Sequence, residues 1–399
     1  MSDLPLLHWT EDDQPHAARW LSGADHPAPR RVVVADDTLA ADRAYRLVCE
    51  GTGLLWRGDF QNARQLLQAL GRRIDRRPQK PSAKPPLKPN PAPATDALTQ
   101  AHHLHRKAQA ERARILGLVL IPLEAGFHVP LRRAPDVVQT CAEVFGAGEA
   151  DADAVISLRE LQGLIGAHEW RKKGVPVPAL GASIHPHYGV FSPVRGEYLD
   201  LVRDAPLPAA LLSAGLPHAQ RQAWDIGAGT GVLAALLARR GVPHVVATEL
   251  APRALACAQD NLQRLGLAAR VTLLQTDLFP PGQAALIVCN PPWLPGKPSS
   301  AVEQGVYDPD SRMLKGFLAG LAAHLAPGGE GWLILSDLAE HLGLRRREEL
   351  LGWIASAGLA VAGRLDTRPR HRKAHDADDP LHAARSAEVT SLWRLVRAA

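Results

Sequence analysis

Cysteine is scarce in this sequence of 399 residues. Only Cys49, Cys141, Cys257 and Cys289 occur, far apart and without a Cys-x-x-Cys pair. This spacing argues against the ligand pairs of zinc sites and against the dense cysteine pattern of a disulfide framework. Because unpaired thiols persist in a reducing compartment, we expect a cytoplasmic protein.

Long apolar runs are missing as well. The most apolar stretch covers residues 115–122, far short of the roughly 20 residues that cross a bilayer as a helix. The first residues, MSDLPLLHWTEDDQ, place acids where a secretory signal peptide needs an apolar core. We therefore expect neither a signal peptide nor a membrane partner.

The histidines lack a metal-binding spacing. His102, His103 and His105 cluster in a predicted helix, but ligand pairs on one helical face are separated by four residues. The sequence therefore predicts no metal site.

Length and composition favour two globular regions. Apolar residues make up 46% of the chain, and the net charge is +5, which permits an anionic partner without requiring one. We expect an N-terminal α/β segment with a supporting or substrate-holding role at 1–77, a Pro/Lys-rich flexible linker at 78–95, the remainder of the N-terminal domain at 96–180, and a second domain at 181–399.

Apolar spacing predicts alternating elements in the first region. We expect a strand at 30–36, a helix at 39–51, a strand at 52–60, helices at 61–73 and 96–116, a strand pair at 117–131, a helix at 134–146 and a linker-like stretch at 172–182.

Residues 72–94 read RRIDRRPQKPSAKPPLKPNPAPA. Repeated prolines and lysines cannot build a core, and they favour an extended polyproline-like tether. Two interpretations stay open: a solvated linker, or a flexible arm that contacts phosphates without reading sequence.

A glycine-rich turn, WDIGAGTG, lies between two apolar stretches. Glycines at 227, 229 and 231 allow a sharp turn and a close backbone approach to a ligand where a strand passes into a helix. The dinucleotide fingerprint needs its third glycine at 232, which is Val, so an NAD-dependent oxidoreductase is disfavoured. The spacing here is Asp225-x-Gly-x-Gly-x-Gly, and it predicts a cofactor turn.

Two acids follow at the ends of predicted strands. Glu249 ends VPHVVATEL, 18 residues after Gly231, and Asp277 follows the strand in RVTLLQTDLF. A carboxylate at the tip of the second strand can accept hydrogen bonds from two vicinal ribose hydroxyls.

The fourth strand, ALIVC, continues into Asn290, Pro291, Pro292 and Trp293. Two adjacent prolines fix φ and remove two donors, which makes a stiff extended loop. The Asn290 side-chain oxygen and the Pro291 carbonyl would grip an NH₂ group, while the aromatic ring stacks on the flat group that carries it. Downstream, Asp308 and Asp310 are expected to cap the next helix rather than act as bases.

These motifs, in this order, resemble the class I S-adenosylmethionine-dependent methyltransferases. The glycine turn matches their first motif. Asn-Pro-Pro-Trp is similar to the Asn-Pro-Pro-aromatic signature of enzymes that methylate adenine N6, cytosine N4, guanine N2 or glutamine N5. The resemblance is to the "small" methyltransferase domain of ribosomal RNA guanine-N2 and release-factor glutamine enzymes, and it runs from Ile184 to the C-terminus. Trp293 departs from the commoner Tyr or Phe.

The resemblance implies an α/β architecture: a Rossmann-like domain with a seven-stranded mixed sheet and an antiparallel closing strand, preceded by a smaller α/β domain. It implies S-adenosyl-L-methionine as cofactor. Catalysis would involve Asn290, Pro291, Pro292 and Trp293. The cofactor would be bound by Phe191, Pro193, Asp225, Gly227, Gly229, Gly231, Glu249, Asp277 and Asn290.

The acceptor stays open at this point. We expect a base in RNA, with DNA adenine or a protein glutamine amide as alternatives, and a degenerate fold used only for RNA binding as the non-enzymatic one. Basic residues in the last predicted loop would contact the nucleic acid or serve solubility alone: Arg368, Arg370, Arg372 and Lys373. The oligomeric state is open, with a monomer slightly favoured.

Overall fold

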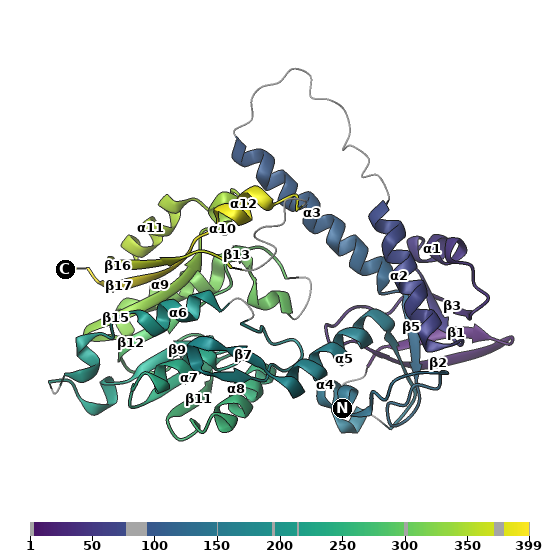
Figure 1. Ribbon diagram of the computed structural model, residues 1–399, viewed down its shortest axis with the longest axis horizontal. Coiled ribbons are helices and arrows are strands. Elements are labelled where there is room, and N and C mark those ends of the chain that lie inside the picture. Colours follow the sequence, from purple (N-terminus) through teal and green to yellow (C-terminus); the bar gives the residue numbers. More distant parts are fainter. Residues whose placement is uncertain are drawn as a thin grey trace, which may run out of the picture. The chain divides into compact units, whose positions relative to one another are not determined.

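The computed structural model describes residues 4–76, 94–149, 151–193, 196–213, 215–298, 302–370 and 379–398. The chain forms two compact units (Figure 1). The first comprises Met1–Asn90 and Leu104–Glu169, and the second comprises Pro91–His103 and Trp170–Ala399. Of the expected linker at 78–95, only residues 94 and 95 lie within the described ranges, where they begin a helix.

The first unit contains a six-stranded sheet. In order across the sheet, the strands are β1 (Leu6–Glu11), β2 (Gln14–Leu21), β6 (Ala154–Ser157), β5 (Val119–Leu123), β4 (Thr52–Trp56) and β3 (Arg31–Ala35). β3, β4 and β5 run parallel, whereas β6 is antiparallel to β5 and β1 is antiparallel to β2. The predicted strands at 30–36 and 52–60 are therefore present.

Among the described residues, five α-helices belong wholly or partly to this unit. They are α1 (Ala41–Cys49), α2 (Phe60–Arg76), α4 (Val138–Phe145), α5 (Leu158–Lys173) and α3 (Ala94–Leu116). Residues 94–103 of α3 and 170–173 of α5 are assigned to the second unit. The expected strand pair at 117–131 is wrong. β5 pairs with β4 and β6, and beyond it only an isolated bridge joins Glu124 to His128.

The second unit contains a seven-stranded sheet (Figure 1). In order across the sheet, the strands are β11 (Val271–Gln275), β10 (Val245–Glu249), β9 (Ala223–Ile226), β12 (Ala284–Cys289), β15 (Leu325–Ser336), β17 (Thr390–Arg397) and β16 (Leu359–Thr367). The first five are mutually parallel, and β17 is antiparallel to both neighbours. This is the predicted mixed sheet with an antiparallel closing strand.

Both faces of this sheet are covered by helices. Besides the parts of α3 and α5 assigned to this unit, its described α-helices are α6 (Glu197–Asp204), α7 (Val232–Arg239), α8 (Pro252–Arg264), α9 (Arg312–His324), α10 (Leu338–His341), α11 (Arg347–Ser356) and α12 (His382–Ala387). Successive strand residues alternate between two cores: Ala223 packs with α6 and α7, and Trp224 packs with α9 and α11. Burial on both faces explains the nearly continuous apolar runs of the central strands.

Two details differ from the sequence-based expectation. Residues 172–182 are not an open linker, because β7 (Val175–Val177) and β8 (Ala182–Ile184) pair there as an antiparallel ribbon. The Pro-Gly-Gly of residues 327–329 does not close α9, which ends at His324, but lies inside β15. A Cβ on Gly329 would lie 3.0 Å from the Ala285 carbonyl oxygen, so glycine is needed where β15 approaches β12.

Candidate active site

The central strand pairs place three sequence motifs at one level of the sheet. Ile226 at the end of β9 pairs with Thr248 on one side and with Cys289 on the other. The next residue on each strand is Gly227, Glu249 or Asn290. Because parallel strands present their carboxyl ends at the same sheet edge, the glycine turn, the acid and the Asn-Pro-Pro loop begin side by side.

The glycine turn has left-handed backbone at all three glycines, with φ of 80°, 53° and 77° at Gly227, Gly229 and Gly231. Side chains other than glycine rarely adopt these values. Gly231 and Gly229 differ in the space around them. A Cβ on Gly231 would lie 3.1 Å from the Cβ of Ala258 on α8, whereas a Cβ on Gly229 would meet nothing within 4 Å. The turn therefore leaves an open space at Gly229.

Glu249 is held by the backbone of the site. Its Oε2 accepts a hydrogen bond from the Gly229 nitrogen at 3.0 Å, and its Oε1 accepts one from the Ala251 nitrogen at 2.9 Å. The side chain is half-buried. Each carboxylate oxygen keeps a further lone pair, so the acid can still accept from ligand hydroxyls.

Asp225 is completely buried. One carboxylate oxygen, Oδ2, accepts a hydrogen bond from the Ala234 nitrogen at 2.9 Å. The other, Oδ1, is buried and finds no donor among the described residues. Burial raises the pKa of this carboxyl to about 7, the Ala234 hydrogen bond opposes the shift, and the charge of Glu249 adds to it. A buried acceptor without a donor is chemically suited to a ligand that brings N–H groups or positive charge.

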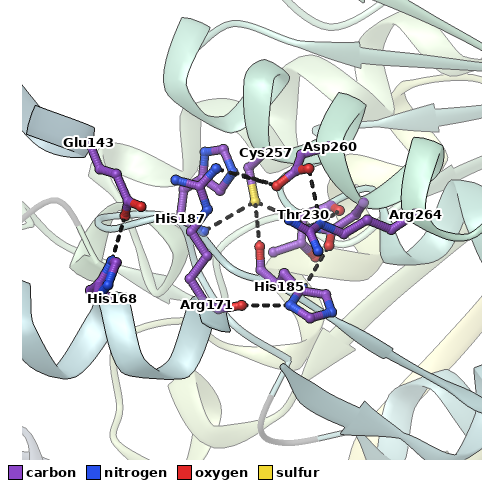
Figure 2. A network of polar contacts seen from close by, with 10 residues as sticks. Glu143, His168, Arg171, His185, His187, Thr230, Cys257, Asp260 and Arg264 are labelled. Atoms are coloured by element: carbon purple, nitrogen blue, oxygen red, sulfur yellow. Dashed lines mark hydrogen bonds and ion pairs between the residues drawn. The ribbon is translucent and has the colours of Figure 1, made fainter. Parts of the chain in front are cut away.

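A polar network ties the chain ahead of α6 to α8 and to the glycine turn (Figure 2). The His185 nitrogen donates to Asn261 Oδ1 at 2.7 Å, and Asn261 Nδ2 donates to the Thr230 carbonyl at 3.1 Å. The Cys257 sulfur accepts from the His187 nitrogen at 3.3 Å. The segment that contains His185 and His187 and the glycine turn therefore share α8 as a common support.

Charged groups complete this network. Asp260 lies 3.2 Å from His187 Nε2, and it accepts hydrogen bonds from Arg264 Nε at 3.0 Å and from Arg171 at 3.4 Å (Figure 2). Burial acts to raise the pKa of Asp260, but the hydrogen bonds and the positive charges outweigh it and leave the pKa below its ordinary value. Burial raises the pKa of the Cys257 thiol to about 11, so this sulfur stays protonated.

Phe191 and Pro193, two of the residues expected to bind the cofactor, lie just downstream of the network. Pro193 is buried and Phe191 is half-buried. A Cβ on Gly305 would lie 2.6 Å from the Phe191 Cβ, so Phe191 packs directly against the segment that follows the Asn-Pro-Pro-Trp loop.

Asn290 is half-buried and well anchored. Its Oδ1 accepts a hydrogen bond from the Trp293 indole nitrogen at 2.8 Å. Tyr198 of α6 also lies close to this side chain: burial raises the pKa of its phenol, and the Asn290 side chain acts to lower it. The rings of Tyr198 and Trp293 meet edge to face, with centroids 6.4 Å apart and an interplanar angle of 86°. Pro291 is buried, and the Trp293 ring packs against both cores of the unit.

Asp277 is not at the same level of the sheet as Gly227, Glu249 and Asn290. It follows β11 by two residues, its side chain is exposed, and it accepts a hydrogen bond from Arg312 at 2.5 Å. The expectation that it contacts the cofactor stays a prediction.

The acids after the loop fall into two cases. Asp308 is buried, and its two oxygens accept from the Met313 and Leu314 nitrogens at 3.1 Å each, which confirms the predicted cap of α9. Asp310 instead occupies a left-handed turn with φ of 55° ahead of that helix.

The basic loop is only partly described. Arg368 and Arg370 are exposed, and the Arg370 nitrogen donates to Glu197 Oε1 at 2.5 Å, which places this end of the loop beside α6. Arg372 and Lys373 lie outside the described residues.

Within the described ranges, no helix is long and apolar enough to cross a membrane, and no group of three or more His, Cys, Asp or Glu side chains could hold a metal ion.

Sequence reasoning missed Tyr198 and the α8 network. Tyr198 reaches Asn290 from 92 positions earlier in the chain, and no local pattern signals so distant a contact. The histidine-rich stretch SIHPHYGVF could have indicated the α8 network. Polar groups this close to a buried strand need hydrogen-bond partners elsewhere in the fold.

Comparison with known proteins adds independent information. Residues 184–347 match the family model described as methyltransferase small domain. The release factor glutamine methyltransferase of Cereibacter sphaeroides is 33% identical over 193 residues, 43% of this chain and 65% of that protein. The tRNA1(Val) (adenine(37)-N6)-methyltransferase of Shewanella loihica is 31% identical over 176 residues, 41% of this chain and 70% of that protein.

A second release factor glutamine methyltransferase, from Moorella thermoacetica, is 35% identical over 150 residues, 32% of this chain and 53% of that protein. The chain thus spans 65% and 53% of the two release factor relatives. Among solved structures, TrmN from Thermus thermophilus matches with a TM-score of 0.32 and 19% identity, covering 51% of this chain and 48% of that one. Because this TM-score and identity are low, we assign the fold from the strand order of the seven-stranded sheet and not from this structural match.

Proposed function

The chain belongs to the methyltransferase small-domain family, and from that premise we propose that it transfers a methyl group from S-adenosyl-L-methionine to a planar amino group. The observation that carries the proposal is the shared level of Gly227, Glu249 and Asn290 along three neighbouring parallel strands. A donor-binding turn and an amine-binding loop there lie close enough to serve one reaction.

The cofactor side of the site would be built from the glycine turn and two acids. Bound S-adenosyl-L-methionine supplies an electrophilic methyl on a positively charged sulfur. Glu249 would accept from the ribose hydroxyls, since each of its oxygens has a free lone pair beyond its backbone bond. Asp225 would offer its unbonded Oδ1 to the amino end of the ligand. Gly229 leaves room for close approach.

The acceptor side would be built from the Asn-Pro-Pro-Trp loop. Asn290 Oδ1 has a second lone pair besides the one that Trp293 occupies. Together with the Pro291 carbonyl it would accept both hydrogens of an NH₂ group, so that the nitrogen lone pair faces the donor. No side chain needs to remove a proton before attack, because positioning lowers most of the barrier. The prediction that the Trp293 ring stacks on the acceptor belongs to this proposal.

We propose a nucleobase in RNA as the first acceptor. The support is chemical: a flat exocyclic amine suits the loop, and Arg368 and Arg370 expose guanidinium groups of the kind that pair with phosphates, although Arg370 also lies 3.7 Å from Asp200 of α6. The tRNA adenine-N6 relative acts on such an amine, according to its name.

A protein glutamine amide is the second candidate. The relatives from Cereibacter sphaeroides and Moorella thermoacetica are both named release factor glutamine methyltransferases. An amide NH₂ presents the same two hydrogens to the loop. The proposed compartment for either activity is the cytoplasm, consistent with four free cysteines, three of them buried.

One experiment separates the candidates. The purified full chain is incubated with S-adenosyl-L-methionine carrying a tritiated methyl, together with RNA, DNA or protein from a strain that lacks the gene. We expect label in RNA, in a form that nuclease digestion releases as a methylated base. Label only in protein replaces the RNA proposal with the glutamine one. Calorimetry that detects no cofactor binding contradicts the methyltransferase proposal and leaves a binding module.

A further inference from the structure

Trp293 of the Asn-Pro-Pro-Trp loop does more than offer an aromatic ring to the acceptor. Its indole nitrogen donates to Asn290 Oδ1 at 2.8 Å. An indole N–H can only donate, so it fixes which end of the Asn290 amide faces Trp293. The amide nitrogen is then the end left to interact with the Tyr198 phenol, whose pKa the Asn290 side chain acts to lower.

Tyr198 is itself held in place. Its side chain is buried on α6, and its ring contacts Trp293 edge to face. Burial, with the nearby charge of Asp225, raises the pKa of its phenol, so the group stays neutral at any working pH. A neutral phenol oxygen accepts from the amide nitrogen without titrating. The two aromatic residues therefore hold the two ends of one amide.

This arrangement bears on the reaction because an amide has two faces of opposite hydrogen-bonding character. If the Asn290 amide rotated by half a turn, its NH₂ would replace its oxygen, and it would repel an acceptor NH₂ instead of gripping it. Only one of the two orientations suits the proposed chemistry.

We propose that Trp293 and Tyr198 are positioning residues that lock the Asn290 amide with its oxygen available to the acceptor amine. The inference rests on the proposed function and deepens it. It also explains how the site uses Trp where the related motif usually has Tyr or Phe: the indole supplies an N–H donor that a phenylalanine ring lacks. Tyr198 supplies the acceptor on the other side.

Two conservative variants test the proposal. Trp293→Phe keeps an aromatic ring and loses the N–H, and Tyr198→Phe loses only the phenol oxygen. Each removes one hydrogen bond to Asn290, so we expect kcat to fall about tenfold in each variant, with cofactor affinity unchanged. In the double variant, kcat should fall by less than the product of the two single reductions. The first substitution already allows the Asn290 amide to rotate, so the second has less to remove. Trp353→Phe, at another half-buried tryptophan of the same unit, is the matched control.

The outcome separates the roles of Trp293. If the ring only stacks on the acceptor, Trp293→Phe keeps the wild-type kcat and the proposal is overturned. If the residue is merely structural, thermal stability and cofactor affinity fall together with kcat, which also overturns it.

A second readout does not need activity. In a spectrum of the ¹⁵N-labelled full chain, the Trp293 indole N–H signal is identified by its loss in Trp293→Phe. We expect this signal to shift in Asn290→Ala and in Tyr198→Phe, even if no acceptor is ever found. Absence of both shifts contradicts the inference. Absence of methyl transfer by the wild type, with the shifts present, contradicts only the proposed function.

Discussion

The Gly229 backbone nitrogen donates a hydrogen bond to Glu249 Oε2 over 3.0 Å. The glycine turn and the acid of the next strand are therefore directly coupled in the fold. The acid holds the turn in shape, and the turn holds the acid at the sheet edge. A change at either residue should disturb both.

Replacement of Glu249 by Gln tests this coupling. A glutamine has one oxygen and one NH₂, so it cannot accept from both the Gly229 and the Ala251 nitrogens. We expect the Kd for S-adenosyl-L-methionine to rise about tenfold or more, the usual scale for losing a charge-assisted bond. Titration calorimetry measures it, with the exposed Glu348→Gln as control. An unchanged Kd contradicts the role of Glu249.

Alanine at two glycines of the turn should give different defects. Both substitutions pay the cost of a left-handed alanine, roughly 1–2 kcal/mol. Gly231→Ala also forces its Cβ against Ala258 of α8, at 3.1 Å, whereas Gly229→Ala meets open space. We expect Gly231→Ala to lower the melting temperature more, and Gly229→Ala to lose cofactor binding while keeping its fold. Equal melting temperatures, or full cofactor binding by Gly229→Ala, would count against an open ligand space at Gly229.

The buried Asp225 predicts a pH dependence of stability. Its pKa of about 7 in the folded chain exceeds the value of about 4 in an unfolded chain. Between these values the folded state holds a proton that the unfolded state has lost, so this group makes stability fall as pH rises from about 4 to about 7. Well above pH 7, both states have lost this proton, and Asp225 causes no further change in stability with pH.

Asp225→Asn removes that titration. We expect the melting temperature of the variant, relative to the wild type, to increase from pH 5 to pH 8 in the absence of ligand. A difference that stays constant over this range shows that Asp225 ionises normally. Saturating S-adenosyl-L-methionine should flatten the wild-type curve, because a donor at Oδ1 favours the carboxylate.

The basic residues beside α6 predict salt-dependent RNA binding. Replacing Arg368 and Arg370 together by Ala should reduce the slope of log K against log salt by up to about 1.4 for single-stranded RNA. Filter binding across a salt series measures the slope. Arg264→Ala, a half-exposed arginine on α8, is the control. A slope identical to that of the wild type means that neither arginine contacts phosphate, and no binding at low salt removes the RNA proposal.

Much of the second unit could be predicted because its signals are local. The glycine turn, the acid at Glu249 and the Asn-Pro-Pro loop each follow an apolar strand, and parallel strands align such positions at one edge. Residues buried on both sheet faces give continuous apolar runs that mark the strands well. The family resemblance implies a seven-stranded mixed sheet with an antiparallel closing strand, and the observed sheet has this form.

The missed elements had misleading local chemistry. The β1–β2 hairpin turns at Asp12 and Asp13, which adopt φ of 49° and 60°, a conformation usually signalled by Asn-Gly. β7 contains Pro176, and a proline-rich stretch reads as a linker although an edge ribbon tolerates it. The contact between Tyr198 and Asn290 depends on tertiary packing alone, so no window of sequence could reveal it.

The central claim is that Asn290 orients an acceptor amine toward a methyl donor held at the glycine turn. The most direct measurement compares wild type and Asn290→Ala for transfer of a tritiated methyl to the labelled acceptor pool, with cofactor Kd measured on the same preparations. We predict that the variant binds S-adenosyl-L-methionine as the wild type does and transfers no detectable methyl. Near-normal transfer by Asn290→Ala would contradict the account.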